Sequence, residues 1–254
     1  MDIQPQTKFK ILLVGDYCTD EYIIGTCDRL SPEAPVPVIK IIERYTGPGM
    51  AGNVKANLDK LGADVDFVTA EAVITKTRYI DQRSRQHLLR VDLEPKISSW
   101  NRKVPQALDK YDCVVISDYN KGFLSYEDIE YLIQNYKGPI FIDTKKPNLS
   151  RFNGAFIKIN ELENRNKTSS NSNMIVTLGS RGAMYGNKIF PTKSVEVVDV
   201  CGCGDTFLAA LSYQYLVTKS INEAIIFANN ASSITVQKEG NYAPTLTEIQ
   251  NARY

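Results

Sequence analysis

The chain has 254 residues and is 43% hydrophobic, and its 30 basic residues nearly balance its 29 acidic residues. This size favours a single domain over residues 1–254. The near neutrality argues against binding to nucleic acid or to an anionic membrane, and no apolar run is long enough to span a bilayer. The polar N-terminus and five cysteines without paired spacing predict a cytoplasmic protein that has no secretion signal.

Short apolar segments rich in β-branched residues alternate with helical patterns along most of the chain. Strands are expected at 10–16, 113–118, 139–143, 155–160 and 174–179, and helices at about 52–62, 125–137, 205–218 and 221–237. This alternation predicts an α/β domain with a mainly parallel sheet. Polar residues end four of the strands: Asp16, Asp118, Asp143 and Asn160. Because such sheets bind ligands at the carboxyl ends of their strands, we expect these residues to share one site.

Two stretches do not fit this alternation. Residues 35–43 and 78–92 have the pattern of exposed strands, and together with 22–26 they predict a small separate sheet at about 22–44 and 78–93. Such a sheet could cover a site as a lid or pair with a second subunit. It contains His87, the only histidine, which argues against a Ser-His-Asp hydrolase. The polar stretch 161–173 is expected to be a surface loop.

The most informative motif is the glycine-rich stretch from Asp199 to Asp205, which runs directly into an amphipathic helix. Free amides and the helix dipole attract anions there, and glycines at 202 and 204 let the backbone approach a phosphate. A carboxylate at this position suits a base that takes a proton from a nucleophile attacking a phosphoryl group. The alternative is that Asp205 only caps the helix. The one-residue gap between Cys201 and Cys203 does not favour a metal site.

A second glycine-rich segment runs from Gly47 to Gly52 and formally matches the dinucleotide motif G-x-G-x-x-G. It follows an exposed strand rather than a buried one, so a turn that admits a polyol, with Asn53 hydrogen-bonding to it, is the better interpretation. A dinucleotide-dependent oxidoreductase remains the alternative. Further along, Asn160 with Glu163 could position hydrated magnesium, and 177–182 suits a nucleotide phosphate or ribose. Walker and protein-kinase motifs are absent from the sequence.

In this order, the motifs resemble those of the ribokinase-like (PfkB-type) carbohydrate kinases over nearly the whole chain. The strongest is the D-[TV]-x-G-x-G-D signature at 199–205, joined by the turn at 47–53, N-x-x-E at 160–163 and T-L-G-S-R-G at 177–182. Within the family, segments 29–38, 84–92, 117–122, 143–145 and 227–231 are similar to the kinases that phosphorylate D-glycero-D-manno-heptose 7-phosphate at O1. The resemblance implies a three-layer α/β/α fold with a small β-sheet lid.

The resemblance also implies a role for each matching residue. Asp205 would accept the proton of a sugar hydroxyl, and the amides of Gly202, Cys203 and Gly204 would form an anion hole. The other implied roles are sugar binding by Asp16, Gly49, Asn53 and Arg85, nucleotide binding by Asn160, Thr177, Gly179, Gly182 and Asn229, magnesium binding through Glu163, and a monovalent cation near Asp199. The expected ligands are ATP, Mg²⁺, K⁺ and a sugar phosphate, and a homodimer is expected through the lid strands.

The chain departs from the family pattern at several positions. Met50 replaces the second glycine of the sugar turn, Gly52 replaces an alanine, and Cys203 replaces an alanine of the anion hole and adds an oxidisable thiol. The stretches at 68–75 and 163–174 are shorter than in the family. A sugar- or nucleotide-binding homologue that has lost catalysis is therefore a second hypothesis.

Overall fold

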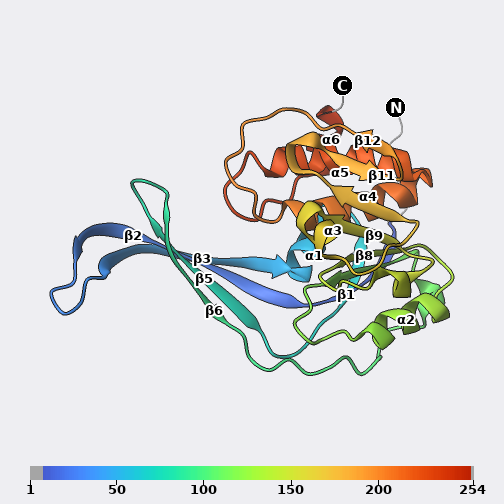
Figure 1. The fold of residues 1–254 in the computed structure, drawn as a ribbon, viewed down its shortest axis with the longest axis horizontal. Coiled ribbons are helices and arrows are strands. Elements are labelled where there is room, and N and C mark those ends of the chain that lie inside the picture. The colour runs from blue at the N-terminus through green and yellow to red at the C-terminus, as the bar shows by residue number, and fades with distance from the viewer. Residues whose placement is uncertain (1–7, 253–254) are drawn as a thin grey trace.

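The computed structural model describes residues 8–252, which form a large sheet, a small sheet and the helices around them (Figure 1). The large sheet has eight strands. In spatial order they are β12 (Lys188–Phe190), β11 (Ala183–Tyr185), β10 (Met174–Thr177), β9 (Phe156–Asn160), β8 (Ile140–Thr144), β7 (Cys113–Asp118), β1 (Lys10–Gly15) and β4 (Asp64–Val68). The strands from β10 to β4 are parallel, and β11 and β12 add an antiparallel edge.

Helices cover both faces of the large sheet, so the predicted three-layer α/β architecture is confirmed (Figure 1). One face packs against α1 (Ala51–Lys60), α4 (Cys203–Thr218), α5 (Ile221–Thr235) and α6 (Leu246–Asn251), and the other against α2 (Tyr126–Asn135). Successive strand residues point to opposite faces. Along β1, Ile11 and Leu13 therefore join the first core, whereas Leu12 and Val14 join the second.

The small sheet has four strands and projects from the α/β body as an arm (Figure 1). In spatial order the strands are β3 (Pro37–Met50), β2 (Tyr17–Leu30), β5 (Ile74–Asp81) and β6 (His87–Leu93). Two of them continue elements of the body, since β2 follows β1 after Asp16 and β3 runs directly into α1. The strands are longer than the sequence predicts, and they begin at the edge of the candidate site.

The polar stretch 161–173 is only partly a loop, so that prediction is wrong in its first half. Residues Glu161–Asn166 form a short helix, α3, because Asn160 and Glu163 cap each other reciprocally. Three short 3₁₀ turns, η1 (Leu108–Lys110), η2 (Leu149–Phe152) and η3 (Gly179–Arg181), complete the described elements. Within residues 8–252 no helix is both long enough and apolar enough to cross a membrane.

Candidate active site

Asp205 is buried in the first turn of α4 and lies at the centre of the candidate site. Its carboxylate accepts hydrogen bonds from Asn53 Nδ2 at 3.0 Å and from the Tyr119 hydroxyl at 2.8 Å. The helix N-cap is Gly202, which has a left-handed φ of 71° and no capping side chain. The alternative interpretation of Asp205 as a helix cap is therefore wrong.

The electrostatic environment of Asp205 suits a proton acceptor at neutral pH. Burial is the largest effect and raises the pKa of Asp205 to about 6, and the nearby Asp143 carboxylate also raises it. The hydrogen bonds from Asn53 and Tyr119 and the charge of Lys158 act in the opposite direction. A carboxyl whose pKa is close to the working pH is both ionised and able to take up a proton.

The glycine turn before α1 brings Asn53 to Asp205. Asn53 Nδ2 also lies 3.4 Å from the carbonyl of Gly202, and Asn57 donates back to Asn53 Oδ1 at 3.2 Å, which fixes the amide orientation. The first residue before α1, Met50, has φ 54°, a backbone conformation that glycine adopts freely. Gly49 packs so tightly that a Cβ there would lie 2.3 Å from Asp20 Oδ2.

Asp16 lies between β1 and β2, next to this turn. Its Oδ2 accepts the backbone amides of Tyr119 at 2.8 Å and Lys121 at 3.3 Å, whereas its Oδ1 is buried without a hydrogen-bond partner in the described part of the chain. A buried unpaired oxygen favours a ligand hydroxyl as its partner. Arg85 is not part of this group, because it lies in the β5–β6 turn and pairs with Glu239 at 3.5 Å.

The backbone of the turn before α4 lies very close to the side chains of Asn53 and Lys158 at two of its glycines. A Cβ at Gly202 would lie 2.5 Å from Asn53 Nδ2, and a Cβ at Gly204 would lie 2.8 Å from Lys158 Nζ. The ammonium of Lys158 therefore lies directly against the helix N-terminus, where it adds positive charge to the helix dipole. Cys203 completes the turn, and burial raises the pKa of its thiol to about 12, so a reactive thiolate is disfavoured at neutral pH.

Lys158 is paired with Asp143 across neighbouring strands of the large sheet. Lys158 Nζ lies 2.7 Å from Asp143 Oδ2, and both side chains are buried. The second oxygen of Asp143, Oδ1, has no hydrogen-bond partner among residues 8–252. Asp143 lines a cavity of about 480 Å³ together with Tyr119, Lys145, Asn160 and Gly204. An unpaired carboxylate oxygen at a cavity fits the oxygen-rich donor set that hydrated Mg²⁺ prefers.

Asn160 and Glu163 are engaged with each other at the start of α3. Asn160 Oδ1 accepts the Glu163 amide at 2.9 Å, and Glu163 Oε2 accepts the Asn160 amide at 2.8 Å. The other oxygen of Glu163 forms an ion pair with Lys145. The N-x-x-E motif therefore stabilises the start of α3 and holds Lys145 at the cavity. Because both oxygens of Glu163 are engaged, this residue could reach a metal only through water.

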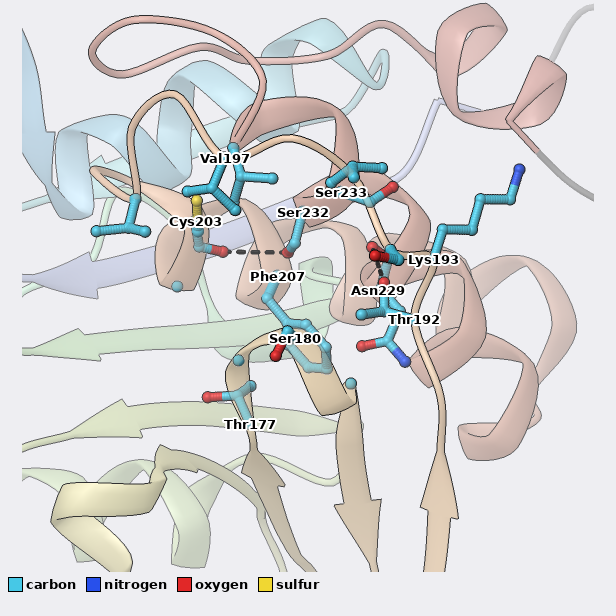
Figure 2. A pocket seen from close by; sticks show the side chains of 17 residues that line it. Thr177, Ser180, Thr192, Lys193, Val197, Cys203, Phe207, Asn229, Ser232 and Ser233 are labelled. Atoms are coloured by element: carbon cyan, nitrogen blue, oxygen red, sulfur yellow. Dashed lines mark hydrogen bonds between the residues drawn. The ribbon is translucent and has the colours of Figure 1, made fainter.

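A second cavity, of about 260 Å³, lies between the β10 end of the sheet and the helices α4 and α5 (Figure 2). It contains all but one of the residues predicted to bind nucleotide: Thr177, Gly179, Gly182 and Asn229, with Asn160 in the neighbouring cavity. The two cavities share Thr177, Gly179, Val200 and Gly204, so they are adjacent. Valine and phenylalanine side chains beside hydroxyls and glycines suit a flat heterocycle joined to a polar chain.

Two of these residues also have structural roles. Asn229 Nδ2 donates to the carbonyl of Phe190 at 2.8 Å and so attaches α5 to the end of β12. Gly182 has φ 90°, and a Cβ there would lie 2.0 Å from the same carbonyl. Both residues therefore hold the segment after β12 against the cavity.

Asp199 connects the loop before α4 to the loop after α5. Its two carboxylate oxygens accept the amides of Cys201 and Gly240, each at 2.9 Å, and these bonds lower its pKa although burial opposes them. Each oxygen keeps a further lone pair, so the donor set fits a monovalent cation at this position. Among the described residues no group of three or more histidine, cysteine or acidic side chains could hold a metal ion.

Sequence reasoning gave no individual role to Tyr119, Lys145 or Lys158, which line the larger cavity together with Asp143, one of the strand-end residues expected to share a site. One signal was available: Lys158 is the only charged residue in the mainly apolar strand β9, and a buried charge needs a partner or a ligand. Tyr119 and Lys145 follow strand ends, but their proximity depends on the strand order.

Comparisons with known proteins agree with this architecture. The model of the pfkB family carbohydrate kinases matches residues 144–248. The bifunctional protein HldE of a Nitratiruptor species is 34% identical over 298 aligned positions, which cover 96% of this chain and 64% of the relative. The alignment is longer than this chain, so the relative carries residues that this chain lacks.

Two solved structures share the fold at low sequence identity. Phosphofructokinase-2 of Escherichia coli in complex with potassium has a TM-score of 0.73 at 16% identity and covers 96% of this chain and 97% of its own. Ribokinase of Arabidopsis thaliana, complexed with ribose and ATP, has a TM-score of 0.71 at 16% identity and covers 97% and 99%. The chain therefore has the ribokinase fold, and its residues 144–248 are similar to the pfkB family carbohydrate kinases.

Proposed function

We propose that this chain transfers a phosphoryl group from ATP to a sugar phosphate, with heptose 7-phosphate phosphorylated at O1 as the leading candidate. The observation that carries the proposal is the position of Asp205. Its buried carboxylate lies beside Asn53 of the sugar turn, on the same helix turn whose Gly204 contacts Lys158 and the larger cavity. A base between an acceptor site and a phosphate site is the arrangement that phosphoryl transfer requires.

In the proposed mechanism the acceptor sugar occupies the space between β1, the glycine turn and α4. The unpaired Oδ1 of Asp16 would accept one of its hydroxyls, and Gly49 and Asn53 would orient the others. Asp205 would take the proton of the attacking hydroxyl. The amides of Gly202, Cys203 and Gly204, with the Lys158 ammonium, would stabilise the charge on the transferred phosphoryl group.

The nucleotide would lie in the cavity lined by Thr177, Gly179, Gly182 and Asn229, with its phosphates directed to the adjacent cavity. When bound there, Mg²⁺ would neutralise phosphate charge, held through water by Asp143, Asn160 and Glu163. Asp199 would hold K⁺ beside the anion hole. Potassium in the phosphofructokinase-2 complex and ATP in the ribokinase complex support these choices by analogy.

A phosphorylated acceptor is favoured by Lys76 on the small sheet. Its half-buried ammonium lies 5.8 Å from the centre of the Tyr119 ring and forms no ion pair within residues 8–252. Arg78 beside it is neutralised by Asp20 at 2.6 Å. A cation without a carboxylate partner next to the sugar turn suits the phosphate of a sugar phosphate.

The test is an ADP-release assay with heptose 7-phosphate, fructose phosphates, ribose and adenosine as acceptors. We expect turnover with heptose 7-phosphate, and Asp205→Asn should lower kcat by about 10²–10⁴-fold because it removes the general base. ATP affinity measured by calorimetry should stay unchanged, and Asp109→Asn, on the surface, should behave as wild type. Unchanged turnover in Asp205→Asn would contradict the mechanism.

Two alternatives give different results in the same experiments. A homologue that has lost catalysis through its shortened segments would bind ATP or sugar by calorimetry without releasing ADP. A dinucleotide-dependent oxidoreductase would bind NAD, which nucleotide fluorescence detects. The geometry disfavours the oxidoreductase, because Gly47 to Gly52 joins β3 of the small sheet to α1 rather than following a strand of the large sheet.

We also propose a homodimer formed through the small sheet. Its strands expose many large apolar side chains, among them Ile41, Ile42, Leu89, Val91 and Leu93. Every residue of the edge strand β6 is exposed. Apolar side chains gathered on a projecting sheet are typical of an interaction surface.

A further inference from the structure

Tyr119 follows β7 and contacts the base, but the mechanism above gives it no role. We propose that Tyr119 is a positioning residue, whose hydroxyl holds the Asp205 carboxylate in its reacting orientation by a hydrogen bond that favours the ionised form. The inference rests on the proposed function, because it concerns the same base.

The contact geometry restrains the carboxylate on both sides. The Tyr119 hydroxyl donates to Oδ1 of Asp205 at 2.8 Å, while Asn53 Nδ2 donates to Oδ2 at 3.0 Å. One donor on each oxygen fixes the rotation of the carboxylate plane. Each oxygen keeps a second lone pair, so one of them can still accept the proton of an acceptor hydroxyl.

The backbone and ring of Tyr119 are themselves held in place. Its amide donates to Asp16 Oδ2 at 2.8 Å, and the next residue, Asn120, donates to Asp118 Oδ1 at 3.0 Å. The ring packs against the cluster formed by Cys18, Met50 and Ile74 at the root of the small sheet. A donor fixed by packing and by its backbone orients a partner better than a mobile one.

The ring also lies near two ammonium groups from different parts of the fold. Lys145, after β8, lies 5.3 Å from its centre, and Lys76, on β5 of the small sheet, lies 5.8 Å away. Both distances are within the range of cation–π attraction. Tyr119 therefore contacts both the base and side chains of the small sheet.

The direction of the hydrogen bond follows from the proton affinities. Burial, and next the Asp205 charge, raise the pKa of Tyr119 well above its usual value, so the phenol keeps its proton and is the donor. Several charged or polar groups surround the base: Asp143 on β8, Lys158 on β9, Asn53 on α1, and Tyr119 and Lys145, which directly follow β7 and β8. Of these, Tyr119 and Asn53 lower the pKa of Asp205 by hydrogen bonding.

The test is the pH profile of kcat/KM for Tyr119→Phe, which removes one oxygen and keeps the ring. Without the phenol donor the ionised form of Asp205 loses a stabilising hydrogen bond, so the pKa of Asp205 rises. We therefore expect the acidic limb of the kcat/KM profile to move to higher pH by about one unit. kcat on the plateau should fall, because the carboxylate loses its orientation, while KM for ATP stays constant. Tyr131→Phe, on α2, is the matched control, since its ring packs against Trp100 and lies away from the base.

The outcomes separate this inference from the proposed function. An active wild type together with an unshifted acidic limb in Tyr119→Phe would overturn the inference alone, whereas a wild type without turnover would overturn the proposed function. If Tyr119→Phe does not fold, 3-fluorotyrosine at position 119 provides the second test. Its phenol is more acidic and donates a stronger hydrogen bond, so the limb should move to lower pH, and an unmoved limb contradicts the inference.

Discussion

At the scale of single residues, the burial of the Asp205 carboxylate, the proposed base, lowers the stability of the folded state at neutral pH. Burial raises its pKa to about 6, whereas a carboxyl in an unfolded chain titrates near 3.8. The folded state therefore binds the proton more tightly than the unfolded state does. Between pH 3.8 and about 6, the contribution of this carboxyl to the free energy of unfolding therefore falls as the pH rises. At pH 7 the carboxyl is ionised, and the full free-energy cost of burying its charge lowers the stability of the fold.

Asp205→Asn should consequently make the protein more stable at pH 7 while removing turnover. The expected gain in the free energy of unfolding is about 1–3 kcal/mol at pH 7, shrinking toward zero near pH 4, where the wild-type carboxyl is protonated as well. Urea denaturation at both pH values measures this difference. Asp109→Asn, at the surface, should leave stability unchanged at both, and a loss of stability in Asp205→Asn at pH 7 would contradict this account.

At the scale of elements, the connection from β10 through η3 to β11 forms one wall of the proposed nucleotide cavity. Gly182 directly follows η3 and has a φ of 90°. A Cβ at this position would lie 2.0 Å from the carbonyl oxygen of Phe190 at the end of β12. Gly186, in the next turn, also has a positive φ of 57° but has open space where a Cβ would lie. A substitution at Gly186 therefore introduces backbone strain alone, whereas a substitution at Gly182 introduces backbone strain and a steric clash.

Gly182→Ala should destabilise the fold by about 2–4 kcal/mol and weaken ATP binding, because the new methyl group pushes the segment after β12 away from the cavity. Gly186→Ala carries only the strain of a positive φ and should cost about 1 kcal/mol, with ATP affinity unchanged. Thermal unfolding and calorimetric titration with ATP compare the pair. Equal effects of the two variants would show that the carbonyl contact does not shape the cavity.

At the scale of the whole molecule, the projecting small sheet is the part of the fold least covered by the body. Leu89, Val91 and Leu93 on β6 are 57%, 46% and 66% exposed, although they are large and apolar. If this sheet pairs two subunits, sedimentation equilibrium should give a dimer for the wild type and a monomer for Leu89→Lys combined with Val91→Lys, because buried ammonium groups oppose association. Val217→Lys, on exposed α4 surface, should remain dimeric. A monomeric wild type at micromolar concentration would refute the dimer.

Sequence patterns predicted the long apolar elements well, because their signal is local. Strands β1, β7, β8, β9 and β10 and helices α1, α2, α4 and α5 lie where apolar periodicity placed them, with ends that differ by a few residues. β11 and β12 were missed, because three residues are too few for a periodicity. α3 was missed as well, since its formation depends on the reciprocal cap between Asn160 and Glu163 rather than on an apolar face.

The glycine-rich signature, the candidate base and the polar strand ends could be predicted from the amino-acid sequence, because each of them is a pattern of neighbouring residues. Which of these residues lie in contact depends on the tertiary structure. The order of the strands brings Tyr119, which follows β7, to Asp205 on α4, 86 positions further along the chain. It also places Lys158 of β9 against Gly204 of α4. Contacts between residues so far apart depend on strand order and on packing around a shared core, and no local pattern encodes them.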